Sequence, residues 1–313
     1  LRRVGRYQHG PGDHHARWQA GGCTPWRERL PGRQVVSPFG PEMPAQRELA
    51  PGIRRLVAPN PSMLTGPGPN TYLFGNRQVA GLDAGPVIDS HLAPIQDFAD
   101  APIRWILVTH THPDHSPGAS LLAKATGAEV LGMAAPDGQH QDITFKADRE
   151  LRDGDQLVTD EFVIEAVHTP GHASNHLCYR HVGKHWLFTG DHVIDGSTVV
   201  IDPPDGSMKH YLQSLRRVKE LNCDVLAPGH GELINDPERL IDWIVDHRLG
   251  REGKVAAALV ANPNLTAREL VPHVYKDVDK KLYAWAERSL LAHLLKLEDD
   301  GAAKCAADRW IGA

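Results

Sequence analysis

The chain has few cysteines and no long apolar run, and both shortages limit what kind of protein it can be. Its four cysteines are widely separated and form no Cys-x-x-Cys pair: Cys23, Cys178, Cys223 and Cys305. We therefore expect a reduced, cytoplasmic protein without structural disulfides. No stretch approaches the roughly 18–20 apolar residues of a membrane span, so no membrane partner is expected. With 41% hydrophobic and 23% charged residues over 313 positions, the composition suits a globular protein with one large and one smaller domain.

The first 46 residues also lack apolar periodicity. Seven arginines stand against three acidic residues there, a net +4 that leaves −9 for the remainder of a chain whose total is −5. The segment has no apolar core of a secretory signal, and its single serine, Ser37, argues against a mitochondrial transit peptide. We expect residues 1–46 to be disordered. Because the first methionine is Met43, residues 1–42 are alternatively an addition foreign to the natural chain.

A dense group of potential metal ligands follows the apolar run at residues 103–108, which reads as a buried strand. The group has four members within six positions: His110, His112, Asp114 and His115. Side chains of an extended chain repeat with a period of two, so the first two histidines are expected to point to the same side. Pro113 breaks the strand, and the last two ligands can turn toward a second point nearby. The segment is therefore predicted to serve two metal ions.

Three more potential ligands occur later in the chain, each after a short apolar strand and a glycine turn. They are His172 in Thr-Pro-Gly-His, Asp191 in Thr-Gly-Asp and His230 in Pro-Gly-His. Glycine allows the backbone to adopt a positive φ and to approach the site closely. Imidazole and carboxylate ligands without thiolates suit zinc or a similar cation in a hydrolytic centre.

Taken in this order, the four motifs resemble the metal signature of the metallo-β-lactamase superfamily. Residues 70–73, residues 83–85 and a helical tail resemble its lactamase-beta-2-like branch, and the similarity covers about residues 49–304. The resemblance implies an α/β fold, a four-layer αβ/βα sandwich with a small, helical, winged-helix-like C-terminal domain. We expect the catalytic domain over residues 47–250 and the winged-helix-like domain over residues 251–313.

The resemblance also implies how the ligands divide between two zinc ions, or similar divalent metals, per chain. One ion is expected on His110, His112 and His172, a second on Asp114, His115 and His230, and Asp191 is expected to bridge both. Two such ions would lower the pKa of a shared water toward 7 and supply a bridging hydroxide. The catalytic role falls to Asp114, which would both ligate and orient the nucleophile.

Other polar residues near these motifs are candidates for substrate contact or for support of the ligands. Asn70 and Tyr72 are candidate substrate contacts. For His176 two functional roles are open, lining the site or holding a ligand in place, and the alternative is a simple surface or packing role. His192 is adjacent to the bridging aspartate but should face the opposite way, so support or core packing is favoured over ligation. The histidines without ligand spacing are read as ordinary: His168, His181, His185, His210, His247, His273 and His293.

Helices are predicted after the metal loop, over residues 116–126, and over residues 209–221, where apolar side chains recur on one face. After Pro237 the pattern becomes helical, with a capping box at Thr266–Glu269, a longer helix that stops at Gly301 and a short tail that ends at Trp310. Residues 255–313 contain eight basic and eight acidic side chains. This balance favours a wall of the active-site cleft or an oligomer contact over nucleic-acid binding.

The sequence predicts a metal-dependent hydrolase, with several substrate classes open. A small-molecule or carrier-bound thioester or ester suits the acidic body and a cleft walled by a helical domain. Single-stranded RNA, cleaved by an endoribonuclease, is the first alternative, although such an enzyme would favour a basic surface. A β-lactam hydrolase is less favoured, because no secretory signal is seen and Asp191 stands where that branch commonly has cysteine. A non-catalytic metal-dependent binding protein is disfavoured, because none of the seven ligands is missing.

Overall fold

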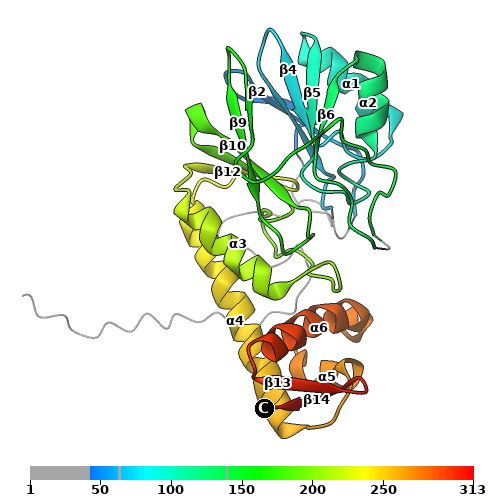
Figure 1. Cartoon of the computed structure of the whole chain (residues 1–313), viewed down its shortest axis with the longest axis vertical. Coiled ribbons are helices and arrows are strands. Elements are labelled where there is room, and N and C mark those ends of the chain that lie inside the picture. Colours follow the sequence, from blue (N-terminus) through cyan, green and yellow to red (C-terminus); the bar gives the residue numbers. More distant parts are fainter. Residues whose placement is uncertain (1–42, 63–64, 139) are drawn as a thin grey trace, which may run out of the picture.

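The computed structural model describes residues 43–62, 65–138 and 140–313. Most of the predicted N-terminal extension, residues 1–42, lies outside the described residues, whereas Gln46 already begins the first strand. The described chain forms two lobes joined by the long helix α4 (Pro237–Ala261), which runs from the sheets to the C-terminal helices (Figure 1). None of the helices in these ranges is long and apolar enough to cross a membrane.

The first sheet has seven strands in the order of the sequence. They are β1 (Gln46–Ala50), β2 (Ile53–Val57), β3 (Asn70–Phe74), β4 (Val79–Leu82), β5 (Ile103–Leu107), β6 (Glu129–Gly132) and β7 (Arg149–Glu150). Strands β1 to β4 pair antiparallel, and β4 to β7 pair parallel. Two helices, α1 (Asp89–Ala99) and α2 (Gly118–Thr126), pack their apolar side chains on one face of this sheet. The predicted helix after the metal loop is thus present, and it ends at Gly127 in a left-handed conformation.

The second sheet has five strands in the order β12-β11-β10-β9-β8. Their bounds are β8 (Gln156–Val158), β9 (Val163–His168), β10 (Leu177–His181), β11 (Trp186–Gly190) and β12 (Val225–Pro228), with a short 3-10 turn, η1 (Val182–Lys184), between β10 and β11. Its outer face is covered by α3 (Met208–Glu220) and the first half of α4. The inner faces of both sheets share one apolar core.

Aromatic side chains join the two sheets at the centre of this core. The Phe188 ring of β11 lies 4.9 Å from the ring of Tyr72 and 4.7 Å from that of Phe74, both on β3, in edge-to-face geometry. Such pairs contribute about 0.5–1.5 kcal/mol each beyond the burial of their area. Helix, sheet, sheet and helix therefore form four layers, and the predicted αβ/βα sandwich is confirmed.

The C-terminal domain packs around its own apolar core. It contains the end of α4, α5 (Ala267–Val274), the 3-10 turn η2 (Lys280–Leu282), α6 (Tyr283–Asp299) and a hairpin of β13 (Ala303–Ala306) and β14 (Arg309–Gly312). The predicted capping box is present, since Thr266 and Glu269 each bond the backbone N–H of the other. The hairpin, which buries Trp310, was expected only as a short tail. The predicted domain boundary at residue 250 falls inside α4, which supplies Ile244 to one core and Val255 to the other.

Candidate metal centre

All seven predicted ligands lie in loops at one edge of the two sheets. His110, His112, Asp114 and His115 follow β5, while His172, Asp191 and His230 follow β9, β11 and β12. Strands β11 and β12 are parallel, as are β4 and β5, so their carboxyl ends open toward the same edge. The local pattern of strand, turn and ligand therefore becomes a three-dimensional cluster once the sheets are packed face to face.

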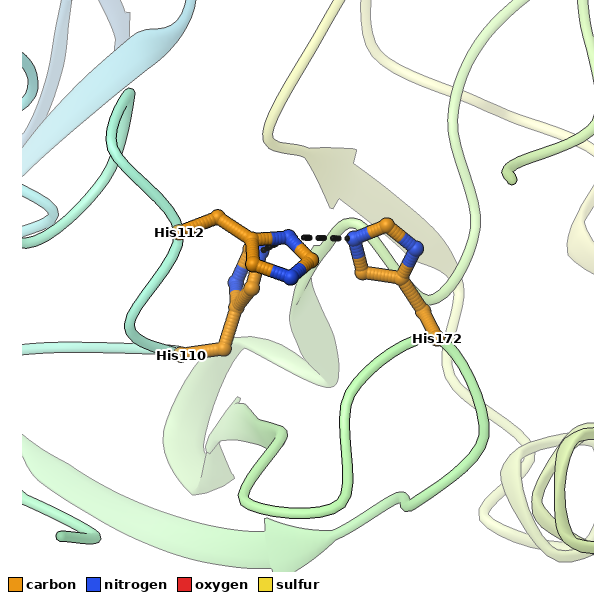
Figure 2. A group of neighbouring side chains, drawn as sticks. All are labelled: His110, His112 and His172. Atoms are coloured by element: carbon orange, nitrogen blue, oxygen red, sulfur yellow. Dashed lines mark hydrogen bonds between the residues drawn. The ribbon is translucent and has the colours of Figure 1, made fainter. Parts of the chain in front are cut away.

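The first set of ligands comprises three histidines whose ring nitrogens converge on one point (Figure 2). Nε2 of His110 lies 3.0 Å from Nδ1 of His112, and Nε2 of His172 lies 2.9 Å from the same Nδ1. Nitrogens bound about 2.0–2.1 Å from a tetrahedral zinc ion would be about 3.4 Å apart. The three rings are therefore close to the arrangement that such an ion needs.

The second set lies beside the first and includes both carboxylates. Nε2 of His230 is 3.3 Å from Oδ2 of Asp114 and 3.3 Å from Oδ1 of Asp191. Nε2 of His115 is 3.4 Å from the same Oδ1 of Asp191. The other Asp191 oxygen, Oδ2, lies 3.8 Å from Nε2 of His172 in the first set. Asp191 thus faces both sets, one oxygen toward each.

Hydrogen bonds at the far side of three of these rings fix which nitrogen faces the centre. Nδ1 of His172 donates to the carbonyl of Val200 at 2.6 Å, and Nδ1 of His230 donates to the carbonyl of Thr65 at 3.1 Å. Nδ1 of His110 contacts the Thr109 hydroxyl at 3.0 Å. In each case Nε2 is left to face the other ligands, and this support orients a ring for metal binding.

Asp83 supplies the corresponding support for His115, a role that the sequence analysis did not assign to it. Its Oδ2 lies 2.9 Å from Nδ1 of His115, and its two oxygens accept hydrogen bonds from the backbone N–H and the hydroxyl of Thr109. Asp83 is buried and has a φ of 52°, directly after β4. The Asp-Ala-Gly sequence after a strand was the only signal, because the contact spans 32 residues.

The close packing of these side chains shifts the pKa values of the ligands in different directions. Burial alone would raise the pKa of Asp114, but His115 and His230 lower it to about 2. Burial would likewise lower the pKa of His230, but Asp191 and Asp114 raise it to about 10. Burial itself lowers the pKa of His112 to about 3, with His172 adding to the effect. A cation that binds here must displace the proton of a histidine whose pKa is raised, such as His230, so metal affinity should depend on pH.

Two glycines leave the space that the ligands occupy. A Cβ on Gly229 would lie 2.7 Å from Oδ1 of Asp191 and 2.9 Å from the His115 ring. Gly171, which precedes His172, has a φ of 148°, and a Cβ there would lie 2.4 Å from the Tyr211 backbone. Any side chain at these positions would displace a ligand or α3, as expected for glycines that bring backbone close to a site.

Asn70 and Tyr72, predicted as substrate contacts, are both buried. The Asn70 amide donates to the carbonyls of Pro228 and Gly231 at 2.8 and 2.9 Å, and the Tyr72 hydroxyl donates to the Pro228 carbonyl at 2.8 Å. Neither residue lines the cleft described below. Their geometry is that of a support beneath the loop that carries His230.

His176 is fully buried and also lies behind the ligands. Its Nε2 accepts a hydrogen bond from the Asp191 backbone N–H at 3.1 Å, and its Nδ1 lies 2.9 Å from the Thr169 hydroxyl. Burial, followed by the nearby His192 and His172, holds the pKa of His176 well below its usual range, so the ring is neutral. Of the two roles left open for His176, the geometry favours holding a ligand. His192 is buried against the Tyr211 ring, 5.2 Å between centroids, as a packing residue would be.

Buried polar atoms without a hydrogen-bond partner indicate whether a cation fits the centre. Nε2 of His115 and Oδ1 of Asp191 are fully buried and have no hydrogen-bond partner among the described residues. A buried polar atom without a partner costs about 1–3 kcal/mol or more, unless something else satisfies it. Three overlapping groups of these ligands have their donor atoms within 4.8 Å of one another. The residues present therefore fit divalent cations bound by nitrogen and oxygen.

The centre lies in the wall of a cleft of about 1050 Å³ between the two lobes. From the lobe that contains the two sheets, the cleft is lined by His112, Asp114, His172, Asp191 and His230, and by residues of the segments 137–138, 140–141 and 197–205. From the C-terminal lobe it is lined by residues of α5 and α6: Ala267, Arg268, Ala284, Trp285, Glu287, Arg288 and Leu291. The C-terminal domain is thus a wall of the cleft, one of the roles expected from its balanced charge.

Each of the two lobes matches the model of a known family. Residues 64–230 match the model of the metallo-beta-lactamase superfamily, and residues 266–310 match that of the beta-lactamase associated winged helix domain. The fold resembles a beta-lactamase domain protein from Burkholderia ambifaria, with a TM-score of 0.74 at 23% identity over 88% of this chain and 96% of that one.

Two relatives are similar over most of their length. A Drosophila melanogaster protein named beta-lactamase-like protein 2 homolog is 30% identical over 83% of this chain and 92% of its own. An Aspergillus chevalieri protein named atrochrysone carboxyl ACP thioesterase is 32% identical over 83% of this chain and 85% of its own. The chain therefore belongs to the metallo-beta-lactamase superfamily of hydrolases and carries a C-terminal winged-helix domain of the kind associated with it.

Proposed function

We propose that the protein is a binuclear, zinc-dependent hydrolase that acts on a thioester or ester, either a small molecule or one attached to a carrier. The observation that carries this proposal is the pair of converging ligand sets that share Asp191 in the wall of a large cleft. One ion would be held by His110, His112 and His172, the other by Asp114, His115 and His230. Asp191, with one oxygen toward each set, would bridge them.

Each part of the site would contribute separately to hydrolysis. A pair of divalent ions, when bound, would supply Lewis acidity and make water an effective nucleophile near neutral pH. Asp114 faces the cleft as a charged carboxylate and would accept a hydrogen bond from the attacking water, orienting it toward the acyl carbon. The water oxygen forms a bond to that carbon, the carbon–sulfur or carbon–oxygen bond breaks, and the water's proton ends on the released thiol or alcohol. Asp83 and His176 hold His115 and Asp191 in place during this reaction.

The charges of the cleft support a compact acyl substrate over a polyanion. Its lining includes six acidic side chains, Asp114, Asp137, Asp191, Asp202, Asp205 and Glu287. The arginines of the lining are Arg268 and Arg288, and each is paired with a carboxylate, Glu287 at 3.1 Å and Asp202 at 2.8 Å. Nucleic-acid affinity depends largely on free basic groups that neutralise phosphates. The name of the Aspergillus relative points in the same direction, toward a carrier-bound thioester.

An activity panel on zinc-loaded protein tests this proposal. It compares acyl thioesters on a small thiol and on a carrier protein with simple esters, single-stranded RNA and β-lactams. We expect thioester or ester hydrolysis to be fastest, with RNA cleavage weaker and strongly reduced by moderate salt. Efficient RNA cleavage that persists in salt, together with inert thioesters and esters, would reverse the assignment.

A further inference from the structure

A four-residue segment between β11 and α3, residues 199–202, touches the candidate metal centre and the C-terminal half of the chain at once. Its Val200 carbonyl accepts the hydrogen bond from Nδ1 of His172 at 2.6 Å. The preceding carbonyl, that of Val199, accepts from Nη2 of Arg248 on α4 at 2.5 Å. The Asp202 carboxylate, two residues after Val200, accepts from Nη1 of Arg288 on α6 at 2.8 Å.

The side chains of the segment are also fixed. Val199 and Ile201 are buried in the apolar cluster that contains side chains of α3, of α4 and of α6 through Ala292. Arg248 itself is buried, and its guanidinium lies 5.6 Å from the centre of the Tyr211 ring. The segment therefore has little freedom to move unless α4 or α6 moves with it.

This arrangement matters because a ring nitrogen that binds metal is oriented by the group on its other nitrogen. Loss or displacement of such a partner typically weakens metal binding about 10–100-fold. The partner of His172 is a backbone carbonyl, which no side-chain substitution at Val200 can remove. Its position is set by the groups that hold the segment, Arg248 and Arg288, and both come from the helices that lead into or form the C-terminal domain.

We propose that the C-terminal domain, together with the helix α4 that leads into it, positions the metal ligand His172 through residues 199–202, with Arg288 of the domain and Arg248 of α4 as the positioning residues. The winged-helix domain is then part of the metal centre's support in addition to being a wall of the cleft. Separation of the domain from the body, or its displacement by a bulky substrate, would change metal affinity at the ion held by His172. This inference rests on the proposed metal centre.

The test uses the full chain and zinc as the probe. Zinc is titrated into metal-free protein in competition with a chromophoric chelator, which yields a dissociation constant for each site. The variant Arg288→Met removes the bond to Asp202 from a side chain that is 40% exposed, so the fold should survive. Arg248→Met removes the inner bond, and Arg268→Met is the matched control, an exposed arginine of the same cleft wall that is paired with Glu287 and not with the segment.

We expect Arg288→Met and Arg248→Met each to raise the dissociation constant of one zinc site about tenfold or more. Arg268→Met should leave both constants unchanged. The absorption spectrum of the cobalt-loaded protein should change in the first two variants only, which a general loss of stability would not produce. His172→Ala serves as the reference and should weaken the same site most strongly.

Wild-type constants and spectra in both Arg288→Met and Arg248→Met would overturn the inference while leaving the metal centre intact. Equal weakening in Arg268→Met would also overturn it, because that variant keeps every contact of residues 199–202. If His172→Ala itself binds zinc like the wild type, the proposed centre is wrong, and the inference fails with it. If Arg248→Met does not fold, the Arg288→Met and Arg268→Met pair still decides the matter.

Discussion

Asp83 holds His115 from behind, with Oδ2 of the carboxylate 2.9 Å from Nδ1 of the ring. The carboxylate is itself held by the backbone N–H and hydroxyl of Thr109, both at 2.8 Å, and Thr109 is adjacent to His110. One buried aspartate therefore connects a ligand of each proposed set. Carboxylate–histidine pairs of this kind orient the ring and make it a stronger ligand.

This contact leads to a prediction for Asp83→Asn. The amide keeps the shape of the side chain, and asparagine tolerates the φ of 52° found there. The variant loses the negative charge beside His115, so we expect zinc affinity to fall about 10–100-fold with little change in the far-ultraviolet circular dichroism. Zinc titration and hydrolysis assays measure the effect. Wild-type zinc affinity would show that the carboxylate has only a structural role.

The ligand assignment predicts the metal content of purified protein. We expect close to two zinc or similar ions per chain, because both ligand sets are complete. Either His110→Ala or Asp191→Ala should lower the metal content and abolish turnover, since the first belongs to one set and the second faces both. Elemental analysis and thermal unfolding check this result. Full activity in either variant would contradict the assigned site.

Tyr72→Phe separates support of the His230 loop from contact with substrate. The change removes one hydrogen bond to the Pro228 carbonyl, which Asn70 still bonds at 2.8 Å. We expect the free energy of unfolding to fall by about 1 kcal/mol, with KM unchanged. Denaturant titration and steady-state kinetics measure the two quantities. A large rise in KM without loss of stability would restore Tyr72 as a substrate contact.

His91 should make the protein less stable in mild acid. The side chain is 2% exposed and contacts the Thr71 hydroxyl at 2.8 Å, and burial lowers its pKa from 6.5 to about 4. Between these two values the unfolded chain binds a proton that the folded protein does not. Stability is therefore lost as the pH falls through this window, with a slope of about 1.4 kcal/mol per pH unit from this residue alone.

The substitution His91→Gln isolates this contribution from that of other buried histidines. Glutamine cannot titrate, so the variant should lose less stability than the wild type between pH 6.5 and about 4. Denaturant unfolding at a series of pH values measures the difference. Parallel curves for the two proteins would mean that His91 does not take part.

The sequence predicted best what is encoded locally. Each proposed ligand directly follows a strand and a turn, so a motif such as Thr-Pro-Gly-His is sufficient to find His172. The partners of the ligands were harder to find, because Asp83 and His115, or His172 and Val200, meet only after distant segments pack together. A backbone carbonyl such as that of Val200 also has no signature in the sequence.

The C-terminal half shows the same limit. The capping box at Thr266 depends on residues three positions apart and was correctly predicted. The hairpin of β13 and β14 was not, because its strands are four residues long and turn at Ala307 and Asp308 without glycine. Both of these residues have positive φ values, which are uncommon for residues other than glycine. The residues of the turn therefore did not predict this hairpin.

The most direct test of the proposed function is thiol release from an acyl thioester at zero, one and two equivalents of zinc. We predict that metal-free protein is inactive, that the rate rises until two equivalents are bound, and that Asp191→Ala stays inactive at every loading. Simple esters are assayed in parallel, because the site would also accept them. If the fully loaded protein releases neither thiol nor alcohol while it cleaves RNA, the account of a thioester or ester hydrolase is contradicted.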